Sequence, residues 1–194
     1  MDPRWNAACL NMTTALLLLS ALLLGHANGT NCPDAQALLD AANAYRANHT
    51  ARALTWSSAL AQQATSYAAV LAAQQCALVH SSTGGESLYT LASYPKPDAT
   101  CKRAIDAWYT EVKLYDFAAA SPCAVNCNRP VGHFVQLVWR ASTAVGCGVG
   151  QADVPMPRMP GGVGGCKVIV CYFKPGFQMN DAAYKANVGV PALG

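Results

Sequence analysis

Residues 131–148 read Val-Gly-His-Phe-Val-Gln-Leu-Val-Trp-Arg-Ala-Ser-Thr-Ala-Val-Gly-Cys-Gly. The first half is dominated by β-branched and aromatic residues around a single glutamine, which predicts a strand. Side chains alternate along a strand, so one largely apolar face would carry His133, Val135, Leu137 and Trp139. Taken alone, a histidine on such a face is most simply a core residue with a local hydrogen bond.

Histidine is scarce in the chain, which has four of them. One of them, His26, lies in the N-terminal stretch that is interpreted below as a secretory leader. Another, His49, belongs to Asn48-His49-Thr50, a glycosylation acceptor pattern that predicts a modified Asn48 and an exposed His49. His80 and His133 therefore remain as candidate site residues.

Glutamate is scarcer still, because the chain has only Glu86 and Glu111. The pair Gly84-Gly85 permits a tight turn, across which His80 and Glu86 can converge. Taken alone, this stretch is more simply a solvated loop whose glutamate faces water.

Residues 99–117 predict a helix that brings a carboxylate beside an apolar stripe. Trp108 and Glu111 are three residues apart and are therefore neighbours on the helix surface. An acid in that position needs a partner, or burial raises its pKa. The alternative is a boundary glutamate paired with Lys113 or Arg103 in solvent.

The composition predicts one soluble domain. The chain has 194 residues, no internal repeat and a formal net charge of +3. Its basic residues are scattered and form no stripe interleaved with aromatics, which argues against nucleic-acid binding.

The N-terminus has the pattern of a secretory signal peptide. Arg4 precedes an apolar run over residues 15–24, and small residues follow over 25–29. That run is shorter than the roughly 20 residues that span a bilayer, so an uncleaved anchor is the weaker alternative. We expect residues 1–29 to be removed and the mature protein to be secreted and extracellular.

The cysteines agree with secretion. One of the nine, Cys9, lies in the leader, and the other eight predict four disulfides: Cys32, Cys76, Cys101, Cys123, Cys127, Cys147, Cys166 and Cys171. A zinc–thiolate site at Cys123 and Cys127 is the alternative, but no second cysteine pair has the required spacing. Spacing alone does not determine which cysteines are joined.

Further elements follow from local patterns. Helices are predicted over residues 34–48, capped by Asp34, and from Ser57 or Ser58 to about Gln75. Residues 118–129 are expected to be a loop. Strands are predicted over 145–151 and 166–173, joined by a hairpin excursion over 152–165. That excursion shows no strand pattern. Its Met156 and Met159 suit lipid or membrane contact, although an ordinary exposed loop fits as well.

Several of these stretches resemble the CAP superfamily, which comprises cysteine-rich secretory proteins, antigen 5 and plant pathogenesis-related class 1 proteins. The resemblance is carried by Gly132-His133-Phe134-Val135-Gln136-Leu137-Val138-Trp139, by Trp108-Tyr109-Thr110-Glu111, and by Gly85-Glu86. It covers nearly the whole mature chain. It departs at Ala42, where the family usually has histidine, and at Ser87, where it has asparagine.

The resemblance implies a fold and a pairing of cysteines. Residues 30–194 would form one α+β CAP domain, a three-layer α-β-α sandwich with a short, mostly antiparallel central sheet. A doubly wound fold, which the element order alone permits, would be excluded. Similarity to the plant class implies the bonds Cys76–Cys166, Cys123–Cys127 and Cys147–Cys171, and Cys32 and Cys101 would then pair by elimination.

The resemblance also implies a function. Related proteins bind sterols or fatty acids or act in defence, which predicts a binding protein with lipid or sterol as partner and a defence or extracellular signalling role. Contacts with membrane or cell-surface components are a further expectation. The family cavity often holds a divalent cation, here between His80 and His133 with Glu86 and Glu111 orienting them. Such ligands favour zinc over magnesium.

A second function class stays open at this point. A metal-dependent hydrolase could activate water beside a histidine and a glutamate, and a serine-dependent one could use Ser81 as nucleophile. Known hydrolase motifs are missing from the sequence, so binding is the favoured interpretation.

Overall fold

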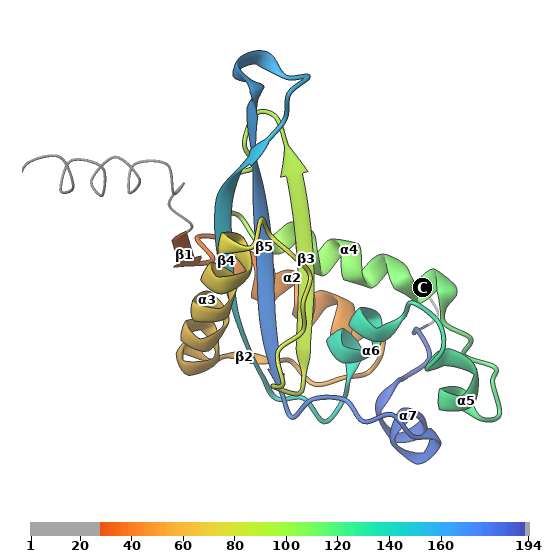
Figure 1. Cartoon of the computed structure of the whole chain (residues 1–194). Helices are drawn as coiled ribbons and strands as arrows, with labels where there is room; N and C mark the ends of the chain where they lie inside the picture. Colours follow the sequence, from red (N-terminus) through yellow and green to blue (C-terminus); the bar gives the residue numbers. More distant parts are fainter. Residues whose placement is uncertain (1–27, 193–194) are drawn as a thin grey trace, which may run out of the picture.

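Two long antiparallel strands, β4 and β5, form the centre of one sheet (Figure 1). The computed structural model describes residues 28–192, so the predicted leader lies outside the described residues except for Asn28 and Gly29, which begin β1. The strand order is β1-β4-β5-β3, and the short β2 pairs with β4 in parallel. The strands are β1 Asn28–Asn31, β2 Thr55–Trp56, β3 Glu86–Ser93, β4 Ala144–Pro155 and β5 Val163–Lys174.

Helices cover both faces of this sheet (Figure 1). Helix α3 packs on one face, and α2, α4 and α6 pack on the other, which confirms the predicted α-β-α sandwich and its mostly antiparallel sheet. The helices are α2 Ala35–Asn48, α3 Ser58–Ala73, α4 Lys102–Tyr109, η2 Thr110–Leu114, α5 Pro122–Asn126, α6 Gly132–Val138, η3 Pro160–Gly162 and α7 Asp181–Asn187. None of the described helices has both the length and the hydropathy to cross a membrane.

The alternation along β4 separates two apolar cores. Val145, Cys147 and Val149 point into the core shared with α2, α4 and α6. The intervening Gly146 and Gly148 lie against the backbone of α3, and a Cβ atom on either would collide with that helix. Close packing of α3 on the sheet therefore depends on these two glycines.

Three of the four disulfides are those that the family resemblance implies, and the fourth joins the two cysteines left over. They are Cys32–Cys101, Cys76–Cys166, Cys123–Cys127 and Cys147–Cys171. The last joins residues that face each other in the β4–β5 register. Because Cys123 and Cys127 are bonded to each other, they are not zinc ligands.

The strand predicted over the first half of residues 131–148 is wrong, because this segment forms helix α6. Phe134 to Val138 are all buried, so the helix has no polar face that would reveal a helical period. A short apolar run of this kind cannot be assigned from periodicity alone.

Tertiary contacts determine the conformation of α6. The Glu111 carboxylate accepts the backbone N–H groups of His133 and Phe134 at 3.1 and 3.0 Å. Arg46, fully buried, donates to the carbonyls of Leu137 and Trp139 at 2.8 and 2.9 Å. The backbone groups that a helix leaves unpaired at its two ends are thus bonded to other elements.

Carboxylates from neighbouring segments cap other helices too. Asp34 was predicted to cap its own helix, but its side chain makes no such bond. It accepts instead from the backbone N–H groups of Cys101 and Lys102, at the start of α4. Only the tertiary fold places it there. By contrast, Ser57 does cap α3, as predicted, by accepting from the Leu60 N–H.

Two predicted irregular segments are more regular than expected. The loop at residues 118–129 contains α5. Strands β4 and β5 extend through most of the predicted hairpin excursion, to Pro155 and from Val163, so only residues 156–162 form the connecting turn. The predicted helix over residues 99–117 is shorter, because α4 ends at Tyr109 and continues as the 3-10 helix η2.

Candidate functional site

The first candidate pair lies at the start of β3. The Nδ1 atom of His80 lies 2.6 Å from Oε1 of Glu86, which also accepts the backbone N–H of Ser81. Gly85 lies between the two residues with φ of 78°, and Phe173 donates its backbone N–H to the Gly85 carbonyl. The glycine thus permits the tight turn that the sequence predicted. The Glu86 side chain is only 2% exposed, whereas that of His80 is 63% exposed.

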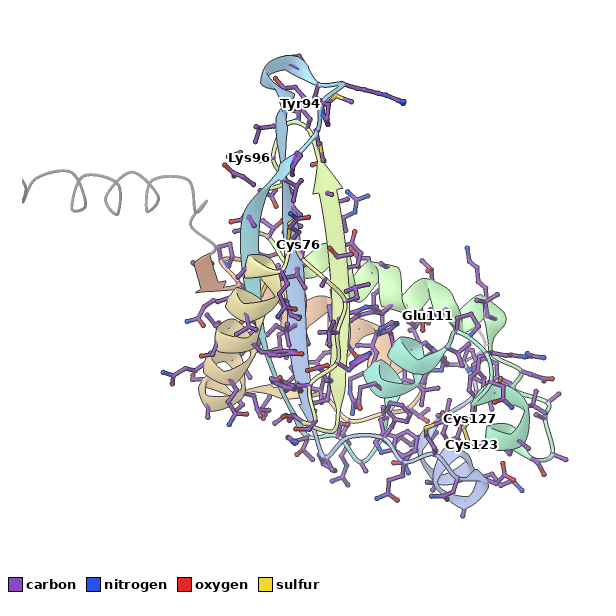
Figure 2. All side chains as sticks on the ribbon, in the orientation of Figure 1. Cys76, Tyr94, Lys96, Glu111, Cys123 and Cys127 are labelled. Carbon is purple, nitrogen blue, oxygen red and sulfur yellow. A yellow bond between two sulfur atoms is a disulfide. The ribbon has the colours of Figure 1, made fainter. Side chains whose placement is uncertain are left out.

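The second candidate pair, Glu111 and His133, joins η2 to α6, and Figure 2 labels Glu111. The Nδ1 atom of His133 lies 2.7 Å from Oε1 of Glu111, whose other oxygen caps α6. The indole of Trp108 stacks on the imidazole, with ring centroids 5.6 Å apart and planes 13° from parallel. His133 is therefore a half-buried, oriented residue, and not a core histidine.

The four candidate residues form two His–Glu pairs. Glu86 faces Tyr172 in the β3–β5 register, and Tyr172 belongs to the core beneath α3. Glu111 and His133 lie in the opposite helical layer. Across residues 28–192, no three His, Cys, Asp or Glu side chains form a group that could hold a metal ion. The convergence of both pairs on one cation stays a prediction.

Trp108 is the residue that links the two pairs. Its ring stacks on His133, and its Nε1–H donates to the carbonyl of Leu88, two residues beyond Glu86. The sequence indicated Trp108 as a neighbour of Glu111, but its bond to β3 is a tertiary contact.

An open groove runs beside the His80–Glu86 pair, between α3, the segment before β3, and β5. Its volume is about 750 Å³, and its lining residues are Leu60, Gln63, Ser66, Tyr67, Val70, Ser81, Thr83, Tyr172 and Lys174. The sequence interpretation missed this groove. An indication of the groove in the sequence was Val70, an apolar residue on the same face of α3 that proves to be exposed.

Polar groups along the groove are held in place. The Tyr67 hydroxyl donates to the Val79 carbonyl at 2.7 Å, and the Ser81 and Tyr172 hydroxyls lie 3.2 Å apart. Burial, together with the negative charge of Glu86, raises the pKa of Tyr172, so this hydroxyl stays protonated and can donate. The Ser81 hydroxyl thus contacts Tyr172, while the neighbouring His80 is engaged by Glu86.

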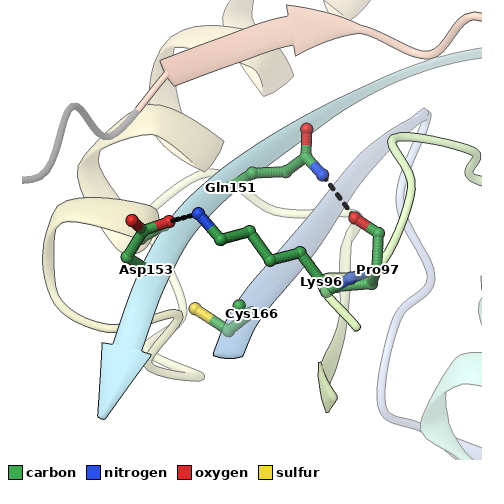
Figure 3. Close-up of a pocket in the computed structure, with 7 residues that line it drawn as sticks. Lys96, Pro97, Gln151, Asp153 and Cys166 are labelled. Atoms are coloured by element: carbon green, nitrogen blue, oxygen red, sulfur yellow. Dashed lines mark hydrogen bonds and ion pairs between the residues drawn. The ribbon is translucent and has the colours of Figure 1, made fainter. Parts of the chain in front are cut away.

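A smaller cleft of about 180 Å³ lies between Lys96 and the edge of β4 (Figure 3). Lys96 pairs with Asp153 across it, and the Gln151 amide donates to the Pro97 carbonyl at 2.7 Å. Because these polar groups are bonded to one another, the cleft offers a ligand fewer hydrogen-bonding groups than the groove beside α3 does.

The residues of the predicted glycosylation site differ in their exposure. Asn48 and Thr50 are exposed, as modification requires, but His49 between them is fully buried. Its Nδ1 atom lies 2.8 Å from the Gly189 carbonyl and its Nε2 atom 3.1 Å from the Tyr109 hydroxyl. The prediction of an exposed His49 is wrong because successive residues at the C-terminal end of α2 point in different directions.

Comparison with known proteins identifies the relatives of this chain. The model of the cysteine-rich secretory protein family, CAP, matches residues 39–173. Pathogenesis-related protein 1A of Nicotiana tabacum is 34% identical over 173 residues, covering 88% of this chain and 94% of the relative. Golgi-associated plant pathogenesis-related protein 1 of Homo sapiens is 31% identical over 159 residues, covering 79% and 91%.

Solved structures share the fold. The crystal structure of NaASP2 with Zn²⁺ superposes with a TM-score of 0.55 at 19% identity, covering 83% of this chain and 90% of that chain. The structure of BmVAL-1 gives a TM-score of 0.55 at 20% identity, covering 85% and 88%.

Proposed function

This chain belongs to the cysteine-rich secretory protein (CAP) family, and from that premise we propose that it is a secreted protein that binds a lipid or sterol without altering it chemically. Its four disulfides are consistent with an extracellular location. Its similarity to the tobacco pathogenesis-related protein favours a role in defence or extracellular signalling.

The groove beside α3 carries this proposal. Ligand sites are typically concave, mostly apolar and about 300–1,000 Å³ in volume, with a few polar groups that fix orientation. The groove has a volume of about 750 Å³ and apolar walls from Leu60, Tyr67, Val70 and Tyr172. It is open enough to accept an elongated apolar body.

The polar end of the groove suits a hydroxyl or carboxylate. The Lys174 ammonium donates to the Gly84 carbonyl at 3.1 Å and has no carboxylate partner among the described residues. The hydroxyls of Ser81 and Tyr172 lie nearby on the same wall. A sterol hydroxyl or fatty-acid carboxylate could pair with these groups while its hydrocarbon part lies against α3.

Binding of fluorescent sterol and fatty-acid analogues to the secreted protein tests the proposal. Val70→Asp places a charge on the groove wall and should weaken binding about tenfold or more. Val190→Asp is the matched control, because Val190 is also exposed but lies outside the groove. Equal affinity in both variants would place the ligand elsewhere.

A divalent cation, preferably zinc, is the second proposal. It is favoured by the two His–Glu pairs, since a carboxylate on one ring nitrogen commonly orients the other toward a metal. The Nδ1 atoms of His80 and His133 are engaged in this way, and no described residue hydrogen-bonds either Nε2 atom. The described residues do not form a complete ligand set, so water would have to complete the coordination.

A further inference from the structure

The β4–β5 hairpin extends past the rest of the sheet (Figure 1). β3 ends at Ser93, opposite Gly165, and β1 pairs with β4 only as far as Gln151. The last β4–β5 pairs, Val154 with Gly164 and Pro155 with Val163, have no third described strand beside them. Residues 154–164, here called the hairpin tip, form a two-stranded projection.

The hairpin tip is apolar where turns are usually polar. Its sequence is Val-Pro-Met-Pro-Arg-Met-Pro-Gly-Gly-Val-Gly, with a single charge at Arg158. Met159 and Val163 are 43% and 45% exposed. Projecting turns normally carry Asn, Asp or Ser, and exposed apolar patches commonly mark interaction sites.

The backbone of the hairpin tip is suited to an environment with little water. Three of its residues are prolines and have no N–H group. Met156, Met159 and Gly162 donate their N–H groups to carbonyls inside the turn, at 2.8, 2.8 and 2.9 Å. Most of the turn donors are therefore missing or satisfied, which lowers the penalty for leaving water.

The charged residues differ between the base and the end of the hairpin tip, which indicates the end that would face a membrane. At its base, Lys96 and Asp153 neutralise each other (Figure 3). Tyr94 is exposed nearby (Figure 2), and tyrosine is enriched where membrane meets water. Arg158 forms no ion pair with any described residue and borders a hollow of about 310 Å³ lined only by residues 156–159. An apolar hollow beside a guanidinium suits an acyl chain below a phosphate.

We propose that the hairpin tip inserts into the interfacial layer of an anionic lipid membrane. A protein partner is less suitable, because a stable interface buries about 1,200–2,000 Å² in total and a two-stranded projection offers little area. Interfacial insertion needs only about 5–10 Å of depth and a few apolar side chains. The proposal does not depend on the groove beside α3.

Flotation with lipid vesicles tests this insertion. The secreted protein should bind vesicles of phosphatidylcholine with phosphatidylserine more tightly than phosphatidylcholine alone. Met159→Asp should weaken binding about tenfold or more, and Arg158→Gln about fivefold, on the anionic vesicles. Met179→Asp is the matched control, because Met179 is exposed away from the hairpin tip.

Two further measurements keep the outcome unambiguous. Met159→Trp should show a blue-shifted emission on anionic vesicles, and Val70→Asp in the groove should bind vesicles like the wild type. Lack of wild-type binding to anionic vesicles would overturn the proposal, as would equal losses in the Met159→Asp and Met179→Asp variants. Light scattering that shows Met159-dependent dimers in place of vesicle binding would assign the hairpin tip to a second copy of the chain.

Discussion

Glu111 and Arg46 hold opposite ends of helix α6. The Glu111 carboxylate accepts backbone N–H groups at the N-terminal end, and the Arg46 guanidinium donates to carbonyls at the C-terminal end. Each charge is opposite in sign to the helix dipole at its end. The same carboxylate also holds the His133 ring, so the helix that carries this histidine is fixed by the residue that orients it.

Replacing Arg46 with methionine should destabilise the protein by about 3 kcal/mol or more, because several buried carbonyls lose their donor. Arg46 bonds four of them, on Arg52, Leu137, Trp139 and Ser142. Burial lowers the pKa of Arg46 to about 10, so it remains cationic at neutral pH. Guanidinium unfolding with the disulfides intact measures the loss. The exposed Arg52→Met is the control, and similar losses in both would contradict this role.

Replacing Glu111 with alanine should reduce stability by about 1–2 kcal/mol, the usual effect of losing a helix cap. Glu111→Gln retains an acceptor and should lose less. His133→Ala leaves the two backbone bonds to Glu111 intact and separates the cap from the imidazole contact. If His133→Ala destabilised the fold as much as Glu111→Ala, capping would not be the main role of Glu111.

Secondary structure that depends only on residues close in sequence could be predicted from local patterns. Residues 145–151 were predicted to be a strand, and they lie within β4, whose two faces pack against different helical layers. Helix α6 could not be predicted in this way. Its conformation depends on Arg46 and Glu111, which are distant in sequence, and its burial removes the polar face that would show the period.

The contact between His80 and Glu86 could be predicted from the local sequence, whereas the contact between Glu111 and His133 is a tertiary one. The glycine turn at Gly85 explains why His80 and Glu86 meet, and helical spacing placed Trp108 beside Glu111. The face of the sheet on which Glu86 lies depends on the strand register, which places Glu86 opposite Tyr172. The sequence alone does not determine that register.

The stability of the fold should fall on mild acidification because of His49. Burial lowers the pKa of His49 in the folded protein, so below about pH 6.5 the unfolded chain binds the proton more readily. This contribution is therefore lost as pH falls below 6.5, until the folded-state pKa is passed. Melting temperatures of the wild type and His49→Gln between pH 7.5 and pH 5 give the comparison. An equal acid shift in both proteins would show that His49 is not responsible.

Asn48 should carry an N-linked glycan when the protein is secreted from a glycosylating host. Asn48 and Thr50 are both exposed at the end of α2, so the acceptor is accessible in the fold. Glycosidase treatment should lower the mass of the wild type, leave Thr50→Ala unchanged, and lower that of Thr50→Ser, which keeps the acceptor pattern. A wild-type protein with the unmodified mass would contradict the prediction.

Zinc titration by calorimetry tests the two His–Glu pairs. Histidine must be neutral to ligate, so zinc and protons compete, and affinity should weaken on acidification. His80→Ala and His133→Ala should each abolish binding if one ion needs both rings. Glu86→Gln should weaken it about 10- to 100-fold, because the amide orients the His80 ring less effectively. His49→Gln is the control, since His49 lies outside both pairs and is bonded to Gly189 and Tyr109. A loss confined to one alanine variant would assign the ion to a single pair, and unchanged affinity in both would reject the proposed cation site.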